Sequence, residues 1–252
     1  MIFVSRVISQ ALALTFILIS LSSVVQEKQH KLYFDMDGSG GWVPFLTASE
    51  VGKPGIVPEI TEAMQRYADI KFIPLSLPQK RAEIALKDGV VDVDFICLEW
   101  LKEGVVGSEY VTSEPFFEIT ESFITLKKNA ELFPTRESLL QKRIGTISGY
   151  FYFDDISFVR TDFLNEKQLM LGLKHERFDV IIMEQEAAKH WAKVHDIEIN
   201  FAILHSKGNL LMRINKKHQS LLPAINHAIK QIKITGELQV ILDKHNAESK
   251  IY

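Results

Sequence analysis

One short phrase occurs twice in the 252-residue chain, and it constrains the fold more than any other feature. Leu86-Lys87 and Leu173-Lys174 are each followed, after four residues, by Asp-Val and a mostly apolar run. The first run reaches Glu99 and the second reaches Glu184. Each copy predicts a helix end, a turn and a buried parallel strand whose C-terminal end presents polar side chains. Because ligands of open α/β sheets bind at such strand ends, the repeat predicts two similar lobes with a site between them.

The composition is that of a globular protein without a nucleic-acid partner. Charged residues make up 24% and apolar residues 46% of the chain, and the net charge is −3. This charge provides no electrostatic footprint for nucleic acid. Cys97 is the only cysteine, which excludes an intramolecular disulfide. No cofactor motif and no metal site are expected, because the calcium-like start at Asp35 has Leu46 where the bidentate glutamate belongs.

The N-terminus is typical of a secretory signal peptide. Arg6 precedes the uncharged run 11–25, and polar residues follow it. We expect residues 1–26 to be cleaved and the mature protein to work in a bacterial periplasm. The alternative is an uncleaved anchor, because residues 7–25 are just long enough to span a bilayer.

The first part of the mature chain follows a β-α-β-α-β pattern. Strands are expected at 31–35, 71–74 and 91–96, with helices at 58–68 and 78–87 between them. Such a pattern predicts parallel strands joined by right-handed crossovers.

The second part repeats the plan. Strands are expected at 144–147 and 180–183, and helices from Asn165 and over 185–195. Two extended connectors, 121–127 and 209–214, join the parts, and amphipathic helices at 221–233 and 237–245 end the chain.

Short pieces along the chain carry a family resemblance by their order and spacing. They include Trp42-Val43-Pro44-Phe45, Leu77-Pro78, Lys80-Arg81, Ser113-Glu114-Pro115-Phe116, Ile144-Gly145-Thr146, Gly149-Tyr150 and Arg177-Phe178-Asp179. On these pieces the chain resembles the type II periplasmic solute-binding proteins of ABC transporters, specifically family 3, best known for amino-acid binding.

The resemblance implies an α/β fold, a two-lobed periplasmic-binding-protein type II clamshell with two hinge strands. Lobe one would be discontinuous, residues 27–118 plus 213–252, with lobe two, residues 119–212, inserted. The two extended connectors would be the hinge strands. It also implies a monomer that closes on a small-molecule ligand and is recognised by an ABC permease or a membrane sensor.

Of the two ligand-binding residues that the resemblance implies, this sequence has the acid but lacks the arginine. In amino-acid binders of this family, an arginine after the third strand of lobe one binds the ligand carboxylate, and an acid of lobe two binds the ammonium. Glu184 stands at the position of that acid. The stretch 97–104 has no arginine and offers only Lys102, beside two glutamates. Lysine lacks the bidentate fork of arginine, so a cationic or amine ligand is favoured.

Seven residues are predicted to contact the ligand: Trp42, Arg81, Glu99, Trp100, Ser148, Tyr150 and Glu184. Each also has a structural interpretation. Trp42 and Trp100 would pack within lobe one, and Arg81 would lie on a solvated helix face. Tyr150 would join an aromatic core with Tyr152, after a strand-to-helix turn at Ser148-Gly149 whose N–H groups suit an anionic group. Glu184 would cap the following helix.

The leading hypothesis is a periplasmic receptor for a small polar solute, amino acid or amine-like, that serves ABC-type uptake. The same clamshell also suits a ligand-sensing component of a membrane receptor. A third hypothesis is an enzyme similar to cyclohexadienyl dehydratase, with Glu184 as a general acid or base. The sequence favours a binding protein over an enzyme, because no second catalytic group is well placed.

Overall fold

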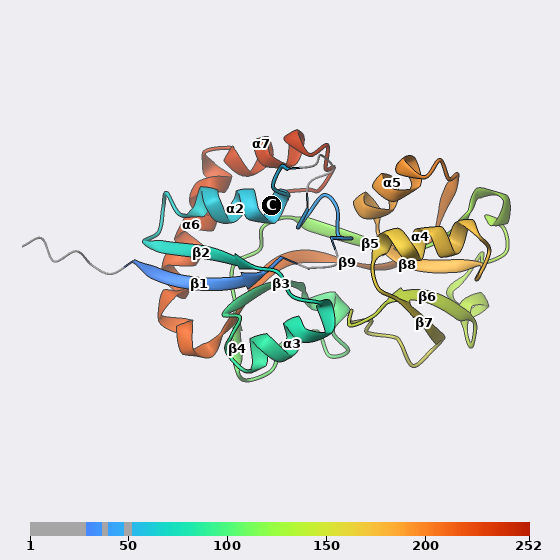
Figure 1. Cartoon of the computed structure of the whole chain (residues 1–252), viewed down its shortest axis with the longest axis horizontal. Helices are drawn as coiled ribbons and strands as arrows, with labels where there is room; N and C mark the ends of the chain where they lie inside the picture. Colours follow the sequence, from blue (N-terminus) through green and yellow to red (C-terminus); the bar gives the residue numbers. More distant parts are fainter. Residues whose placement is uncertain (1–28, 37–39, 48–51) are drawn as a thin grey trace, which may run out of the picture. The chain divides into compact units, whose positions relative to one another are not determined.

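The computed structural model describes residues 29–36, 40–47 and 52–252 (Figure 1). The expected leader, residues 1–26, lies outside this range, as do Asp37 and Ser39 of the calcium-like loop. Contacts divide the chain into two units, Met1–His30 and Lys31–Tyr252, and the fold described below is that of the second. None of the helices in the described ranges is long and apolar enough to span a membrane.

Lobe one contains a mixed β-sheet with helices packed against it. Its strands run in the order β2-β1-β3, and β1 and β3 are parallel with Phe34 opposite Val93. The predicted parallel pairing is therefore confirmed for β1 and β3. The elements are β1 His30–Asp35, α2 Ile56–Met64, β2 Ile70–Leu75, α3 Gln79–Lys87, β3 Val93–Cys97 and the short β4 Tyr110–Thr112.

Helix α2 begins two residues earlier than predicted and ends four residues earlier. The loop before it explains the start, because the first amides of the helix donate to carbonyls of that loop. Ile56 N–H donates to Pro44 O at 3.0 Å and Val57 N–H donates to Phe45 O at 2.8 Å. The end of α3 agrees with the sequence, since Gly89 adopts φ +72° in the left-handed region.

Lobe two repeats this arrangement with one additional strand. Its strands run in the order β5-β8-β6-β7, with β6 parallel to both β7 and β8. The elements are β5 Glu118–Leu126, β6 Arg143–Ile147, β7 Val159–Phe163, α4 Glu166–Lys174, β8 Val180–Glu184 and α5 Gln185–Val194. Asn165 caps α4 as predicted, because its Oδ1 accepts from Gln168 N–H at 2.9 Å. Strand β7 was not predicted.

A long strand pairs with both halves of the sheet. Strand β9, Ile199–Asn215, pairs with β5 as far as Asn209 and with β3 from Leu210 onward, both antiparallel. Figure 1 shows β5 and β9 running together from one half of the sheet into the other. The two connectors predicted from the sequence are therefore extended, as expected. Helices α6 Leu222–Ile234 and α7 Glu237–Lys244 follow and return to lobe one.

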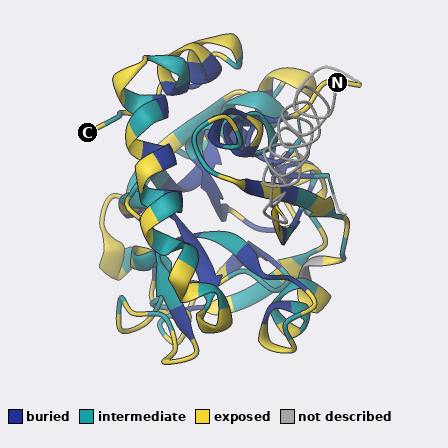
Figure 2. Cartoon of the chain, turned by 90° about the vertical axis from the view of Figure 1, so that its left-hand side faces the viewer, coloured by how far each residue is buried: buried dark blue, intermediate teal, exposed yellow. Residues whose placement is uncertain are grey.

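The apolar run of strand β8 is uninterrupted because every residue of the strand is buried. Its side chains alternate between two faces, and both faces are buried. Ile181 and Met183 belong to the main hydrophobic core, whereas Val180 and Ile182 belong to a second cluster around Phe123. Figure 2 shows the resulting pattern, with buried strands inside and exposed residues along the outer faces of the helices.

Candidate ligand-binding site

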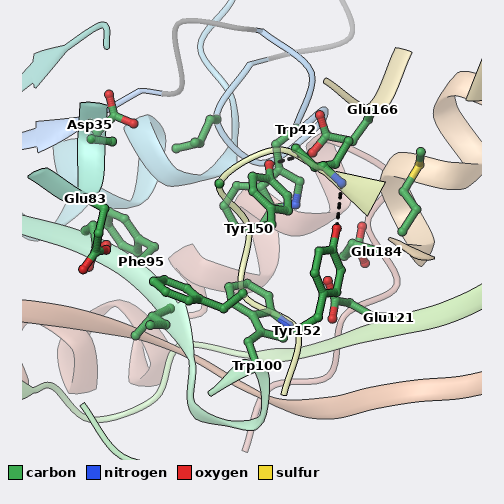
Figure 3. A pocket seen from close by; sticks show the side chains of 18 of the residues that line it. Asp35, Trp42, Glu83, Phe95, Trp100, Glu121, Tyr150, Tyr152, Glu166 and Glu184 are labelled. Carbon is green, nitrogen blue, oxygen red and sulfur yellow. Dashed lines mark hydrogen bonds between the residues drawn. The ribbon is translucent and has the colours of Figure 1, made fainter. Parts of the chain in front are cut away.

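A pocket is lined from both lobes at the ends of the central strands (Figure 3). Glu184, the last residue of β8, is one of its walls and is only 6% exposed. Its Oε2 accepts from Ala187 N–H at 2.8 Å, so Glu184 also caps α5. Burial raises the pKa of this carboxyl to about 8, against the lowering effect of the backbone N–H groups. A pKa raised this far favours the protonated form of Glu184 at neutral pH.

Glu121 lies directly opposite Glu184 in the β5–β8 ladder. It is 5% exposed and lines the same pocket. Its Oε2 accepts from Ser206 Oγ at 2.8 Å and lies 3.1 Å from His205 Nδ1. His205 Nε2 lies 2.8 Å from Asp154 Oδ1. Hydrogen bonds at both ring nitrogens require both to be donors, which is the geometry of an imidazolium between two carboxylates.

The pKa of His205 agrees with this geometry. Burial lowers the pKa, but the hydrogen bonds to Asp154 and Glu121 outweigh burial and hold it above its ordinary value. Glu121 therefore has a compensating charge inside lobe two.

A third acid of lobe two comes from the first turn of α4. Glu166 is 2% exposed, and its Oε1 accepts from Tyr150 Oη at 2.6 Å. Tyr152 stands beside it in the pocket wall, and its hydroxyl accepts from Ile147 N–H at 2.9 Å. Burial raises the pKa of Tyr152 well above its usual range. Both tyrosines are thus fixed by hydrogen bonds and give the wall a rigid aromatic surface.

Lobe one contributes three further acids, Asp35 at the end of β1, Glu83 on α3 and Asp94 on β3. Two of them hold the guanidinium of Arg213, whose side chain is only 4% exposed. Its Nη2 lies 2.6 Å from Asp94 Oδ2 and 2.7 Å from Glu83 Oε2, and its Nε donates to Asp94 Oδ1 at 2.9 Å. The ring of Tyr110 lies 4.9 Å from the guanidinium carbon. Figure 3 shows Asp35 and Glu83 across the pocket from Glu121 and Glu184.

The aromatic part of the lobe-one wall is built around Trp42. Its ring packs against Phe45 at a centroid distance of 4.8 Å and lies edge-on to Trp100 at 6.2 Å. Trp100 sits in a 3-10 turn, Leu98–Trp100, directly after β3. Its buried indole N–H has no hydrogen-bond partner among the described residues. An aromatic body with one neutral donor is typical of small-molecule pockets.

The structure brings together four of the seven predicted contact residues. Trp42, Trp100, Tyr150 and Glu184 line the pocket. The other three do not line it. Arg81 is exposed on α3, and Glu99 is exposed and accepts a hydrogen bond from Cys97 Sγ at 3.0 Å. Ser148 is half-buried, and its N–H donates to Phe163 O at 2.8 Å.

The expected strand-to-helix turn after Ser148-Gly149 is wrong. Residues 148–158 form turns and a loop that lead into strand β7, not into a helix. A helix N-terminus for an anionic group is therefore not formed there. Lys102, the residue nearest in sequence to the expected arginine, is exposed and does not line the pocket.

Several pocket residues were not among those predicted: Asp35, Glu83, Asp94, Phe95, Glu121, Phe151, Tyr152 and Glu166. The sequence pattern could have identified Asp35 and Glu166 as pocket residues. Asp35 ends an alternating strand, and Glu166 directly follows the helix-capping Asn165. Glu121 carried none, since its place beside Glu184 depends on the pairing of β5 with β8.

Contacts across the opening join the two lobes. Trp191 Nε1 on α5 donates to Gly41 O, in the loop after β1, at 2.8 Å. Lys189 Nζ, also on α5, lies 2.7 Å from Glu248 Oε2 near the C-terminus. Gly41 is tightly surrounded, because a Cβ there would lie 2.0 Å from Glu166 Oε2. The two lobes therefore contact each other at the rim of the pocket.

The described residues contain no group of three or more His, Cys, Asp or Glu side chains placed to hold a metal ion. No family model matches the chain. No curated protein matches it in sequence.

Comparison with solved structures gives extensive matches at low identity. A putative L-cystine ABC transporter protein from Listeria monocytogenes matches with a TM-score of 0.73 at 17% identity, covering 88% of this chain and all of the other. A histidine kinase sensor domain similar to periplasmic binding proteins gives 0.75 at 14%, covering 89% and 99%. An ancestral amino-acid-binding protein, a precursor of cyclohexadienyl dehydratase, gives 0.69 at 16%, covering 86% and 96%. The chain has the two-lobed α/β fold of periplasmic solute-binding proteins, a type II clamshell.

Proposed function

We propose that this protein binds a small polar solute carrying an ammonium group and delivers it to an ABC permease. The observation that carries the proposal is the pocket, in which aromatic rings and six carboxyl groups from both lobes face one space. Aromatic walls with a few convergent polar groups favour a small-molecule ligand. The fold supports the same conclusion, because solved structures that share it include substrate-binding proteins of amino-acid ABC transporters.

Glu184 is the proposed partner of the ammonium group. A carboxylate in this position accepts charge-assisted hydrogen bonds, each contributing about 1.5–3 kcal/mol. A cation favours the ionised form of Glu184, so binding releases a proton wherever the carboxyl was protonated. With a pKa of about 8 for Glu184, affinity for a cation should rise with pH up to that value.

Closure of the lobes is the proposed response to the ligand. The division at 27–118 plus 213–252 and 119–212 remains our proposal, with β5 and β9 as the hinge strands. The hydrogen bond from Trp191 to Gly41 would form on closure and hold the ligand between the lobes. A membrane partner would then recognise the closed form.

The proposed location is the periplasm, reached through a signal peptide at residues 1–26, and the proposed state is a monomer. Cell fractionation and N-terminal sequencing of the mature protein test the location. We expect a soluble periplasmic protein that begins near residue 27. An intact Met1 in the membrane fraction would contradict cleavage.

A thermal-shift screen of the purified mature protein tests the binding function. The screen uses amino acids, amines, sugar acids and small dicarboxylates, and each hit is confirmed by calorimetry. A ligand at one hundred times its dissociation constant stabilises the folded state by about 2.7 kcal/mol, which gives a clear rise in melting temperature. A well-folded protein that responds to none of these compounds would contradict the proposal.

Two further functions have a specific observation in their favour. The match to a sensor domain supports a role in ligand sensing. Cells that lack the protein should lose uptake of the ligand if it serves a permease, and keep uptake but lose a response if it serves a receptor.

The second alternative is an elimination enzyme. It is supported by the similarity to a dehydratase precursor and by Glu184, whose raised pKa suits a general acid. Turnover of prephenate or arogenate by the purified protein would establish this function, and we expect none.

A further inference from the structure

The charged side chains on the described pocket wall are all acidic. Among the described residues that line it, none is Lys, Arg or His, and six are acids. In the lobe-two half, Glu121, Glu166 and Glu184 are all at most 6% exposed. The imidazole of His205 lies 3.1 Å from Glu121.

The cation nearest to the lobe-one half is already engaged. The guanidinium of Arg213 forms a bidentate ion pair with Asp94 and also pairs with Glu83. The side chain is buried, and an aromatic ring covers it. A ligand carboxylate would have to displace two carboxylates from this guanidinium to reach it.

The neutral donor offered by Trp100 is weak by comparison. The indole N–H of Trp100 is buried without a partner among the described residues, and it is neutral. A single neutral donor does not replace the charged, bidentate fork that carboxylate recognition uses. Among the described residues, the pocket wall therefore has acceptors for a cation at both ends and no cationic side chain for an anion.

We propose that the ligand is an organic cation, an amine or guanidine, that carries no carboxylate. This inference rests on the proposed solute-binding function and narrows its ligand class. A ligand carboxylate would meet only acids and neutral groups on the described wall, and repulsion by the ionised acids is strong in a partly water-excluded space. The aliphatic or aromatic body of the ligand packs between Trp42 and Tyr150, which lie on the wall between the acids (Figure 3).

Calorimetry with three matched pairs tests the inference. The pairs are arginine and agmatine, lysine and cadaverine, and histidine and histamine, and the members of each differ only by the carboxylate. At pH 8 and 0.15 M salt we expect at least one pair in which the decarboxylated member binds tenfold or more tightly than the amino acid.

The outcomes separate the two proposals. If amino acids bind as tightly or more tightly in every pair that binds, or if no preference reaches tenfold, the ligand-class inference is overturned and the solute-binding function stands. If none of the six compounds binds and the wider screen also fails, with circular dichroism showing a folded protein, both proposals are overturned.

A matched pair of variants tests the role of charge. Glu83→Gln removes one negative charge from the pocket wall and weakens the ion pairing of Arg213. Glu103→Gln is the control, because it removes the same charge from an exposed site outside the pocket. We expect Glu83→Gln to lower the preference for the decarboxylated member at least threefold and Glu103→Gln to leave it unchanged. An unchanged preference in both variants would overturn the electrostatic explanation.

Discussion

At the scale of single residues, Glu184 has two structural roles that shift the pKa of its carboxyl in opposite directions. As a helix cap it accepts from the backbone, which favours the ionised form. As a buried pocket wall opposite Glu121 it is favoured in the neutral form, and burial is the larger effect. The two interpretations offered by the sequence, ligand contact and helix cap, are therefore not exclusive. The cap is observed, and the ligand contact stays a prediction.

Replacement of Glu184 by Gln should separate charge from capping, because the amide oxygen can still accept from Ala187 N–H. The folded pKa of about 8 lies above the ordinary value of 4.5, so the wild-type protein loses stability as pH rises from 4.5 to 8. We expect the two proteins to melt alike near pH 4.5 and the Gln variant to be more stable at pH 8 by at least about 1 kcal/mol. Urea titrations across pH measure this, and parallel stability profiles would contradict it.

Replacement of Glu184 by Ala is the companion experiment. It removes both the charge and the cap, so the gain from the lost charge is offset by about 0.5–2 kcal/mol for the missing cap. The Ala variant should therefore be less stable than the Gln variant at every pH. Equal stability of the two variants would show that the hydrogen bond to Ala187 contributes nothing.

At the scale of elements, helix α5 joins the pocket to the rim of the opening. Its N-terminus begins at Glu184, and its Trp191 reaches Gly41 in the other lobe. Net values for such hydrogen bonds are about 0.5–1.5 kcal/mol.

Trp191→Phe should therefore weaken ligand affinity about threefold to tenfold, mainly through faster dissociation, because the lost donor acts in the closed form. Lys193→Gln, an exposed change on the same helix, is the control and should leave affinity unchanged. Stopped-flow dissociation rates give the measurement. A Phe variant with wild-type rates would show that the contact does not hold the lobes closed.

His205 joins β9, β5 and the loop before β7 through Glu121 and Asp154. Because its folded pKa is raised, its stabilising contribution is complete below the unfolded value of 6.5 and is lost as pH rises through the folded pKa. His205→Gln should cost about 3 kcal/mol at pH 6 and clearly less at pH 9. Thermal unfolding at the two pH values checks this, and a cost that grows with pH would contradict the ion-pair explanation.

The elements also show what could be predicted from the sequence. Strands β3 and β8 were predicted because an apolar run between polar neighbours has few alternatives in a buried parallel sheet. Strand β7 was missed because Val159–Phe163 alternates weakly and leaves Val159 exposed at the sheet edge. In the site, Trp42 and Glu184 follow predicted strands, whereas Glu121 reaches the pocket through strand pairing, which local patterns do not encode.

At the scale of the whole molecule, the unit Lys31–Tyr252 is expected to open and close about β5 and β9. The contacts of Trp191 and Lys189 with lobe one would then exist only in the closed form. Small-angle scattering with and without the tightest compound of the six amines and amino acids should show a smaller radius of gyration for the complex. Tight binding with an unchanged profile, where the free protein is not already closed, would contradict hinge motion.

The pairing of β5 with β9 has a consequence for the order of the chain. Glu118 and Asn209 lie directly opposite each other in an antiparallel ladder, where Cα atoms are about 4.5–5.5 Å apart. A two-residue turn spans such a gap. We therefore expect the stretch 119–208 to behave as an insertion whose two ends lie next to each other, so that it could be removed as a unit. A chain that joins 118 to 209 by such a turn keeps β1, β2, β3, β4 and all of α2, α3, α6 and α7 in their original order.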